Sequence, residues 1–276
     1  MYFPLNIFIL HMILAGYANA LPNFTQPLAN YKWPSQFVRT NQANIQVLVQ
    51  GTGPTVVLLP SYGRDGGDDY NYFTNQLVSA RYLVLRPHPR GTFESTSPMI
   101  NVSLADLAAD IAAVIDNLGG GKAVVIGHAF GTFLAQVTSV IYPEKIPAIV
   151  VAAPGGIDLP TGVAQLPFVA GNTSLPLSKR LEALYVWHEG RYPDVLAMEY
   201  TAVKKYGSLK RYWASGDNTQ VLESSRGSQW NVSSTRYPER ATSVVIADAA
   251  HALFPEQPRA IVEVVLPWLK QQSSKL

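Results

Sequence analysis

Residues Val124 to Gly131 read VVIGHAFG, and this stretch decides the fold. The apolar residues at its start predict a buried strand, and Phe130 begins an apolar helical pattern that runs to Ile141, just before Pro143. Between strand and helix stands the pattern Gly-x-Ala-x-Gly. Such glycines are typical of a sharp turn whose strained central residue projects above the sheet, at the positive end of the helix.

Apolar runs of four to six residues recur on both sides of this turn and predict the other strands. They are rich in Val, Ile and Leu and are continuous rather than alternating. This indicates a sheet that is buried on both faces and is therefore mostly parallel. The runs span residues 45–49, 55–59, 82–85, 123–126, 148–152 and 243–247.

Helical patterns separate these runs. Leu104 to Leu118 has apolar residues at helical spacing, with Ser103 as the N-cap, Asp106 three positions later and three glycines after its end. A further helix is expected at residues 260–271. Strands that alternate with helices predict the α/β class, with a doubly wound, mostly parallel sheet.

The stretch from residue 155 to residue 213 interrupts this alternation. It is rich in proline, tyrosine and tryptophan, and it precedes the last predicted strand. We interpret it as an inserted helical lid over the carboxyl ends of the strands, the edge at which open α/β sheets bind ligands. The remainder of residues 21–276 is expected to form one domain around it.

The first twenty residues differ from the rest of the chain. They contain no Lys, Arg, Asp or Glu, are apolar up to Ala15 and end in Ala-Asn-Ala, which predicts a secretory signal peptide over residues 1–20. An N-terminal helix or membrane anchor is the alternative. Four glycosylation sequons agree with secretion, and no stable membrane span is expected after cleavage. The sequons begin at Asn23, Asn101, Asn172 and Asn231.

Composition excludes several classes of function. The 276 residues carry a net charge of +2 with no basic run longer than two residues, which argues against nucleic acid as a partner. The chain has no cysteine, so it has no disulfide, thiolate metal site or cysteine nucleophile. Its His and acidic residues show no metal-ligand spacing, and no metal or other cofactor is expected.

Four motifs in chain order resemble those of the α/β-hydrolase family. The turn at residues 127–131 resembles its nucleophile elbow. Residues 58–63 (LLPSYG) stand where the family places an oxyanion-hole donor, and residues 86–95 (RPHPRGTFES) resemble its D-x-R-G-x-G-x-S loop. Residues 248–258 (DAAHALFPEQP) resemble its stretch with the catalytic histidine, here His251. The similarity covers residues 36–276 and implies an α/β-hydrolase fold.

Ala129 is the first departure from the family pattern, because it stands where the resemblance implies a nucleophilic serine. A methyl group cannot attack a carbonyl, and in a serine hydrolase its presence removes about six orders of magnitude in rate. Three explanations remain open: an engineered Ser→Ala change, a native alanine in an enzyme with other chemistry, and a native alanine in a catalytically silent protein. We favour a native alanine.

The oxyanion site and the acid also depart from the pattern. Ser61 and Tyr62 replace the family's His-Gly, so backbone N–H groups of Phe130 and Tyr62 would remain as donors beside a bulky side chain. No aspartate follows the expected seventh strand, for which residues 219–224 are the best match. The candidate acids, in order of preference, are Asp217, Asp158 and Glu223.

Histidines other than His251 are expected to do no chemistry. His128, beside the elbow, is expected to line the pocket and pack against the sheet, and His88 and His188 are expected at the surface or in the lid.

The sequence therefore predicts a hydrolase-like enzyme for a small organic ester, lactone or related carbonyl compound. His251 would act as general base or acid without a serine nucleophile, in proton transfer, cyclisation, elimination or water activation. The alternatives are a silent homologue that binds a small apolar ligand and a serine esterase with a Ser→Ala change at position 129. Three departures at one site favour a chain that has given up serine chemistry and kept the elbow for its shape.

Overall fold

The computed structural model describes residues 6–12, 33–61, 66–97, 102–153, 169, 174–176, 179, 241–246, 249 and 253–276. The strands are β1 (Asn6–Met12), β2 (Ser35–Arg39), β3 (Asn44–Gln50), β4 (Thr55–Leu59), β5 (Leu83–Pro87), β6 (Val124–His128), β7 (Ala148–Ala152) and β8 (Ala241–Ile246). The α-helices are α1 (Asn71–Ser79), α2 (Leu104–Leu118), α3 (Phe130–Ile141), α9 (Leu253–Glu256) and α10 (Pro258–Gln272). Two 3₁₀ turns, η1 (Asp68–Tyr70) and η3 (Ser273–Lys275), complete the described elements.

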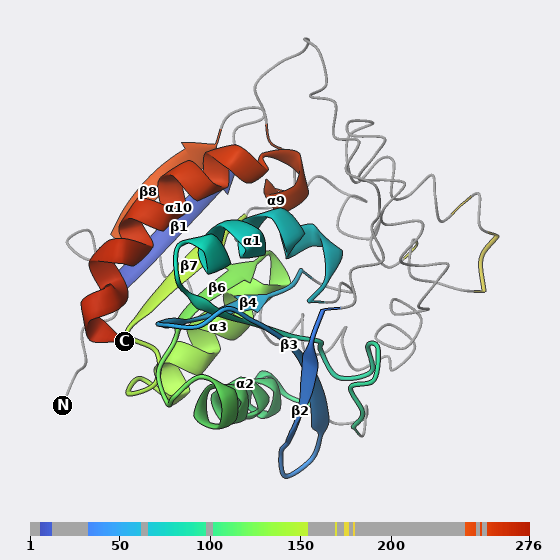
Figure 1. Ribbon diagram of the computed structural model, residues 1–276. Coiled ribbons are helices and arrows are strands. Elements are labelled where there is room, and N and C mark those ends of the chain that lie inside the picture. The colour runs from blue at the N-terminus through green and yellow to red at the C-terminus, as the bar shows by residue number, and fades with distance from the viewer. Residues whose placement is uncertain are drawn as a thin grey trace.

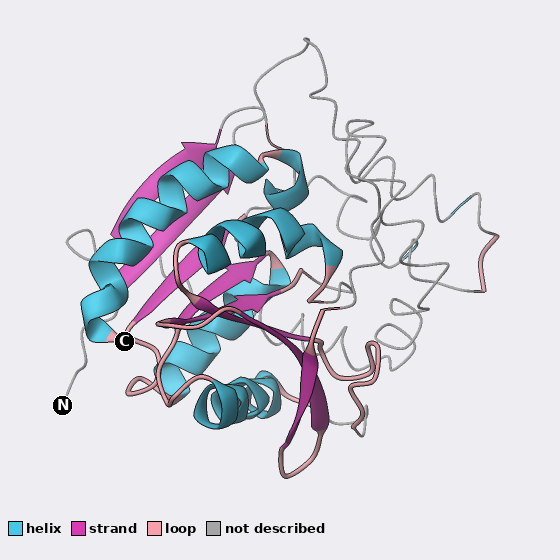
Figure 2. Ribbon diagram, in the orientation of Figure 1, coloured by secondary structure: helices cyan, strands magenta, loops and turns pink. Residues whose placement is uncertain are grey.

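The described strands form one mixed sheet in the order β2-β3-β5-β4-β6-β7-β1-β8. β3 pairs antiparallel with β2 and with β5, and the pairs from β5 to β8 are parallel. Helices α2 and α3 cover one face of the sheet, and α1 and α10 cover the other (Figures 1 and 2). The α/β class and the mostly parallel sheet predicted from the sequence are confirmed.

The core consists of two apolar layers that share the central strands. Val57 and Leu59 of β4 point into the layer beneath α2 and α3, whereas Val56 and Leu58 point into the layer beneath α1 and α10. Successive residues of a strand face opposite sides of a sheet, so a strand between two helical layers must be apolar at every position. This is why continuous apolar runs marked these strands in the sequence.

Several predicted elements have the predicted bounds. Strands β4 and β7 and helices α2 and α3 match to the residue. Helix α2 begins with a capping box, in which the Ser103 Oγ accepts from the backbone N–H of Asp106 and the Asp106 carboxylate accepts from the backbone N–H of Ser103. The Ser103 hydroxyl, which donates to the Asp106 carboxylate at 2.6 Å, and the Ser103 N–H hold the pKa of the Asp106 carboxyl below its usual value.

One strand arises from the segment predicted to be a signal peptide. β1 lies between β7 and β8 and is parallel to both, in register from Asn6↔Ala148 to Leu10↔Ala152 and from Ile7↔Ala241 to Met12↔Ile246. In Figure 1 it appears in blue beside the red β8. A chain cleaved after Ala20 would not contain this strand. Secretion and cleavage stay predictions.

The predicted lid at residues 155–213 lies outside the described residues, apart from five scattered positions, and so do the four sequon asparagines. The expected seventh strand at residues 219–224 lies outside them as well. Within the described part of the chain, no helix combines the length and the apolar character needed to cross a membrane.

Candidate active site

Ala129 forms the apex of a strained turn between β6 and α3. Its backbone has φ 49° and ψ −109°, a left-handed region that residues with a side chain rarely enter. The N–H of Ala129 donates to the carbonyl of Ala152 at 2.9 Å, which ties the turn to the end of β7. The Ala129 carbonyl accepts from Thr132 Oγ1 at 2.6 Å and from the Thr132 N–H at 3.0 Å. The surrounding hydrogen bonds therefore hold the strained conformation in place.

The two glycines of the pattern are required by close backbone contacts. A Cβ on Gly127 would lie 2.1 Å from the carbonyl oxygen of Gly131, and a Cβ on Gly131 would lie 2.3 Å from the carbonyl oxygen of Leu59. Both distances are far below van der Waals contact. The sharp turn and the close approach of α3 to β4 thus explain the Gly-x-Ala-x-Gly pattern without any reference to chemistry.

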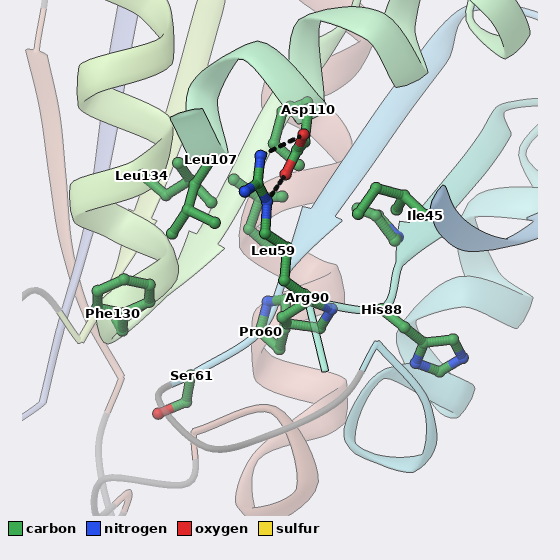
Figure 3. A pocket seen from close by; sticks show the side chains of 13 residues that line it. Ile45, Leu59, Pro60, Ser61, His88, Arg90, Leu107, Asp110, Phe130 and Leu134 are labelled. Atoms are coloured by element: carbon green, nitrogen blue, oxygen red, sulfur yellow. Dashed lines mark hydrogen bonds and ion pairs between the residues drawn. The ribbon is translucent and has the colours of Figure 1, made fainter. Parts of the chain in front are cut away.

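A small cavity lies beside the elbow, with a volume of about 30 Å³. Its apolar wall includes Leu59, Leu107, Phe130 and Leu134, and Ser61 lines it at the end of β4 (Figure 3). Such a volume holds about two water molecules. The predicted pocket residues Ser61 and Phe130 therefore line one cavity, which has room for water.

A buried ion pair forms the polar wall of this cavity (Figure 3). Arg90 Nε donates to Asp110 Oδ2 at 2.6 Å, and Arg90 Nη2 donates to Asp110 Oδ1 at 3.0 Å. Thr40 Oγ1 donates a third hydrogen bond to this carboxylate, at 3.0 Å. The pair joins the loop after β5 to α2. The sequence marked Arg90 only as part of a motif, and Asp110 carried no signal except its polar character in an apolar helical pattern.

His88 is buried, so the expectation that it lies at the surface or in the lid is wrong. Its Nδ1 accepts the N–H of Gly66 at 3.2 Å, and its ring stacks on Phe93 with the ring centroids 4.2 Å apart. Burial and the nearby Arg86 guanidinium lower the pKa of His88 from 6.5 to about 3. The ring is therefore neutral at physiological pH and links residue 66 to the loop after β5.

His128 is buried at the end of β6, as expected of a residue that packs against the sheet. Its ring meets the edge of Phe254 with the centroids 5.6 Å apart, and Phe254 also contacts Tyr70 and Phe73. Phe254 belongs to α9, which lies within the motif of residues 248–258, just after His251. A chain of aromatic contacts therefore connects the strand before the elbow with the part of that motif that follows His251.

The other predicted site residues lie outside the described residues: Tyr62, Asp158, Asp217, Glu223 and His251. Those that the structure describes lie together at the carboxyl ends of β4 and β6, namely Ser61, His128, Ala129 and Phe130. Within the described residues, no group of three or more His or acidic side chains is placed to hold a metal ion.

The known proteins similar to this chain include epoxide hydrolases and other hydrolases. The family model of the α/β hydrolase fold matches residues 54–230. An epoxide hydrolase of Caballeronia sordidicola is 25% identical over 201 residues, which cover 70% of this chain and 55% of the relative. Epoxide hydrolase 3 of Siraitia grosvenorii is 28% identical over 115 residues, which cover 41% of this chain and 36% of the relative. The chain thus matches about half or less of the length of these curated relatives.

Among solved structures, an epoxide hydrolase from Vigna radiata superimposes with a TM-score of 0.64 at 17% identity. The superposition covers 86% of this chain and 98% of that one. At this identity the likeness concerns the fold alone.

Proposed function

The chain belongs to the α/β hydrolase fold family, and from this premise we propose that it adds water to a small organic electrophile without forming a covalent enzyme intermediate. The substrate class we propose is an epoxide or a related carbonyl compound such as an ester or lactone. His251 serves as the general base, and the elbow binds the substrate oxygen.

One observation carries this proposal: the elbow keeps its strained geometry although its apex is an alanine. A left-handed apex costs about 1–3 kcal/mol, and such strain persists where the surrounding structure over-determines it, typically at active sites. The geometry directs the N-terminus of α3 toward the substrate side of the sheet, and the first N–H groups of a helix attract developing negative charge.

The described neighbours of His251 support its role. Ala249 and Leu253 are buried on either side of it in the sequence, and Phe254 contacts His128, the residue before Ala129. β8 and β6 run parallel within the sheet, so the loops after both strands leave from the same edge. The described residues on either side of His251 therefore lie at the edge that also carries the elbow, which supports the proposed role.

The reaction balances with water as the only co-reactant. The water oxygen attacks an epoxide carbon, that carbon's bond to the ring oxygen breaks, and His251 accepts the proton that the water gives up. The ring oxygen then receives this proton from the His251 imidazolium and becomes the second hydroxyl of a diol. The cavity beside Ser61 has room for the water. For an ester, the same attack leads to a tetrahedral oxyanion that helix α3 stabilises.

The His251 imidazole also needs an acid to orient it, and we propose Asp217, with Asp158 and Glu223 as alternatives. A carboxylate beside the ring stabilises the imidazolium that forms during proton transfer. The Tyr62 side chain adds a hydroxyl donor beside the substrate oxygen.

Ala129→Ser is expected to introduce acyl-enzyme chemistry. A serine at the strained apex stands beside the proposed base and the N-terminus of α3, so hydrolysis of p-nitrophenyl acetate is expected to rise about 100-fold or more over that of the native chain. The product is expected to appear with a burst of about one equivalent per enzyme. Stopped-flow absorbance measures both quantities.

Ala153→Ser provides the matched control for this experiment. Ala153 also has φ 49° and is also buried, but it follows β7 rather than the elbow strand. It should show neither the burst nor the rate increase. A burst in both variants, or in neither with both folded, would contradict the assignment of position 129 as the functional apex.

A further inference from the structure

Strand β8 is joined to the described sheet through β1 alone. β8 is the last strand in the order of the sheet, and its six paired residues all face β1. On its other side β1 pairs with β7, so the N-terminal segment bridges two strands that are otherwise not neighbours. Neighbouring strands lie about 4.8 Å apart, so without β1 a gap of about 10 Å would separate β7 from β8.

We propose that Asn6–Met12 is a permanent strand of the folded protein, and that cleavage after Ala20 would act as an off-switch by releasing β8 and the loop that follows it. Removing β1 would leave rows of backbone N–H and C=O groups without partners along β7 and β8. Unpaired backbone groups in a sheet interior are costly, because water cannot replace every lost hydrogen bond there. The strand next to the gap is therefore expected to detach.

Loss of β1 is expected to affect the candidate active site, because β8 leads directly into the loop with His251. β8 ends at Ile246, five residues before His251. Helix α10 packs against both β8 and α1, and Phe254 of α9 contacts His128 of the elbow strand. In the uncleaved chain, β1 holds the end of the loop with His251 that begins at β8, and α9 holds the other end. In a chain that begins at Leu21 the α9 end remains held, and β8 keeps its contacts with α10.

This proposal does not rest on the proposed reaction, because its measurement is structural. The full chain is produced in a bacterial cytosol, so that the N-terminal segment is kept, and amide hydrogen exchange is followed by mass spectrometry. Ile9→Pro is the test variant, because Ile9 pairs with Val151 on one side and with Ser243 on the other, and proline removes a ladder donor. Gly16→Pro, beyond the end of β1, is the matched control.

In Ile9→Pro, exchange in residues 241–246 is expected to become about 100-fold faster, while residues 124–128 of β6 stay protected. The Gly16→Pro control should keep native protection in both segments. Native protection of residues 241–246 in Ile9→Pro would overturn the proposal.

A second measurement applies even if the Ile9→Pro variant does not fold. The native chain is expressed in a secreting eukaryotic host. The intact mass is then measured for the fraction of molecules in which residues 241–246 are protected from amide exchange. That fraction is expected to retain residues 6–12. A protected fraction that begins at Leu21 would overturn the proposal.

Discussion

Asp110→Ala is expected to lower the free energy of unfolding by about 3–5 kcal/mol, because it leaves the Arg90 guanidinium buried without its carboxylate. The two side chains are 3% and 5% exposed, and the Arg90 Nε to Asp110 Oδ2 distance is 2.6 Å. Thr40 Oγ1 would lose this acceptor as well and keep the Ala43 carbonyl at 3.3 Å. Urea unfolding at pH 7, followed by circular dichroism, measures the loss.

Asp116→Ala is the control from the same helix. Asp116 pairs with Lys145 at the same distance of 2.6 Å, but its side chain is 47% exposed. An exposed pair contributes about 0–1 kcal/mol because water and salt screen it. Equal losses for the two variants would show that the buried pair does not hold the loop after β5 to α2.

The ion pair also shows what the sequence could not reveal. The residues with the clearest signals were those buried on both faces of the sheet, such as the strand at residues 55–59, because burial dictates their apolar character at every position. The partnership of Arg90 with Asp110 depends on how α2 packs against the loop after β5. Twenty residues separate the two side chains in the sequence, and no local pattern connects them.

Sequence reasoning missed β2 and α1 because few residues of either element are buried. β2 is an edge strand in which Val38 alone is buried, and α1 has three buried residues, Phe73, Thr74 and Leu77, in an otherwise polar segment. Elements with so small a buried face leave little hydrophobic periodicity. β1 is apolar except for Asn6 and His11, and an apolar run of that length is as typical of a signal peptide as of a buried strand.

The candidate site was predicted in part. The elbow was evident from its two glycines, because close backbone contacts restrict those positions to glycine. His88 was misjudged, since nothing in its sequence context indicates that its ring accepts the N–H of Gly66 and stacks on Phe93. Such contacts form only when distant loops meet.

His251→Ala is expected to reduce kcat for the native chain's substrate by about 100- to 10,000-fold, which is the usual contribution of a general base. KM should change little, because the imidazole acts on the attacking water rather than on the bound substrate. Steady-state kinetics with styrene oxide and with p-nitrophenyl acetate measure both constants. His188→Ala, a histidine from the predicted lid, is the control and should keep native kcat.

The thermal midpoints of both histidine variants should remain near that of the native chain, so that a change in kcat reports chemistry and not unfolding. Unchanged kcat in a folded His251→Ala variant would remove His251 from the mechanism. The elbow and the N-terminus of α3 would then have to serve a base from elsewhere in the chain.

The most direct test of catalysis without an enzyme nucleophile is a single turnover in H₂¹⁸O, with the native chain in excess over styrene oxide. We predict that the first diol formed carries one ¹⁸O atom, because water attacks the epoxide carbon directly. Formation of diol whose new oxygen is ¹⁶O, donated by a protein carboxylate, would contradict the account, and so would the absence of any diol.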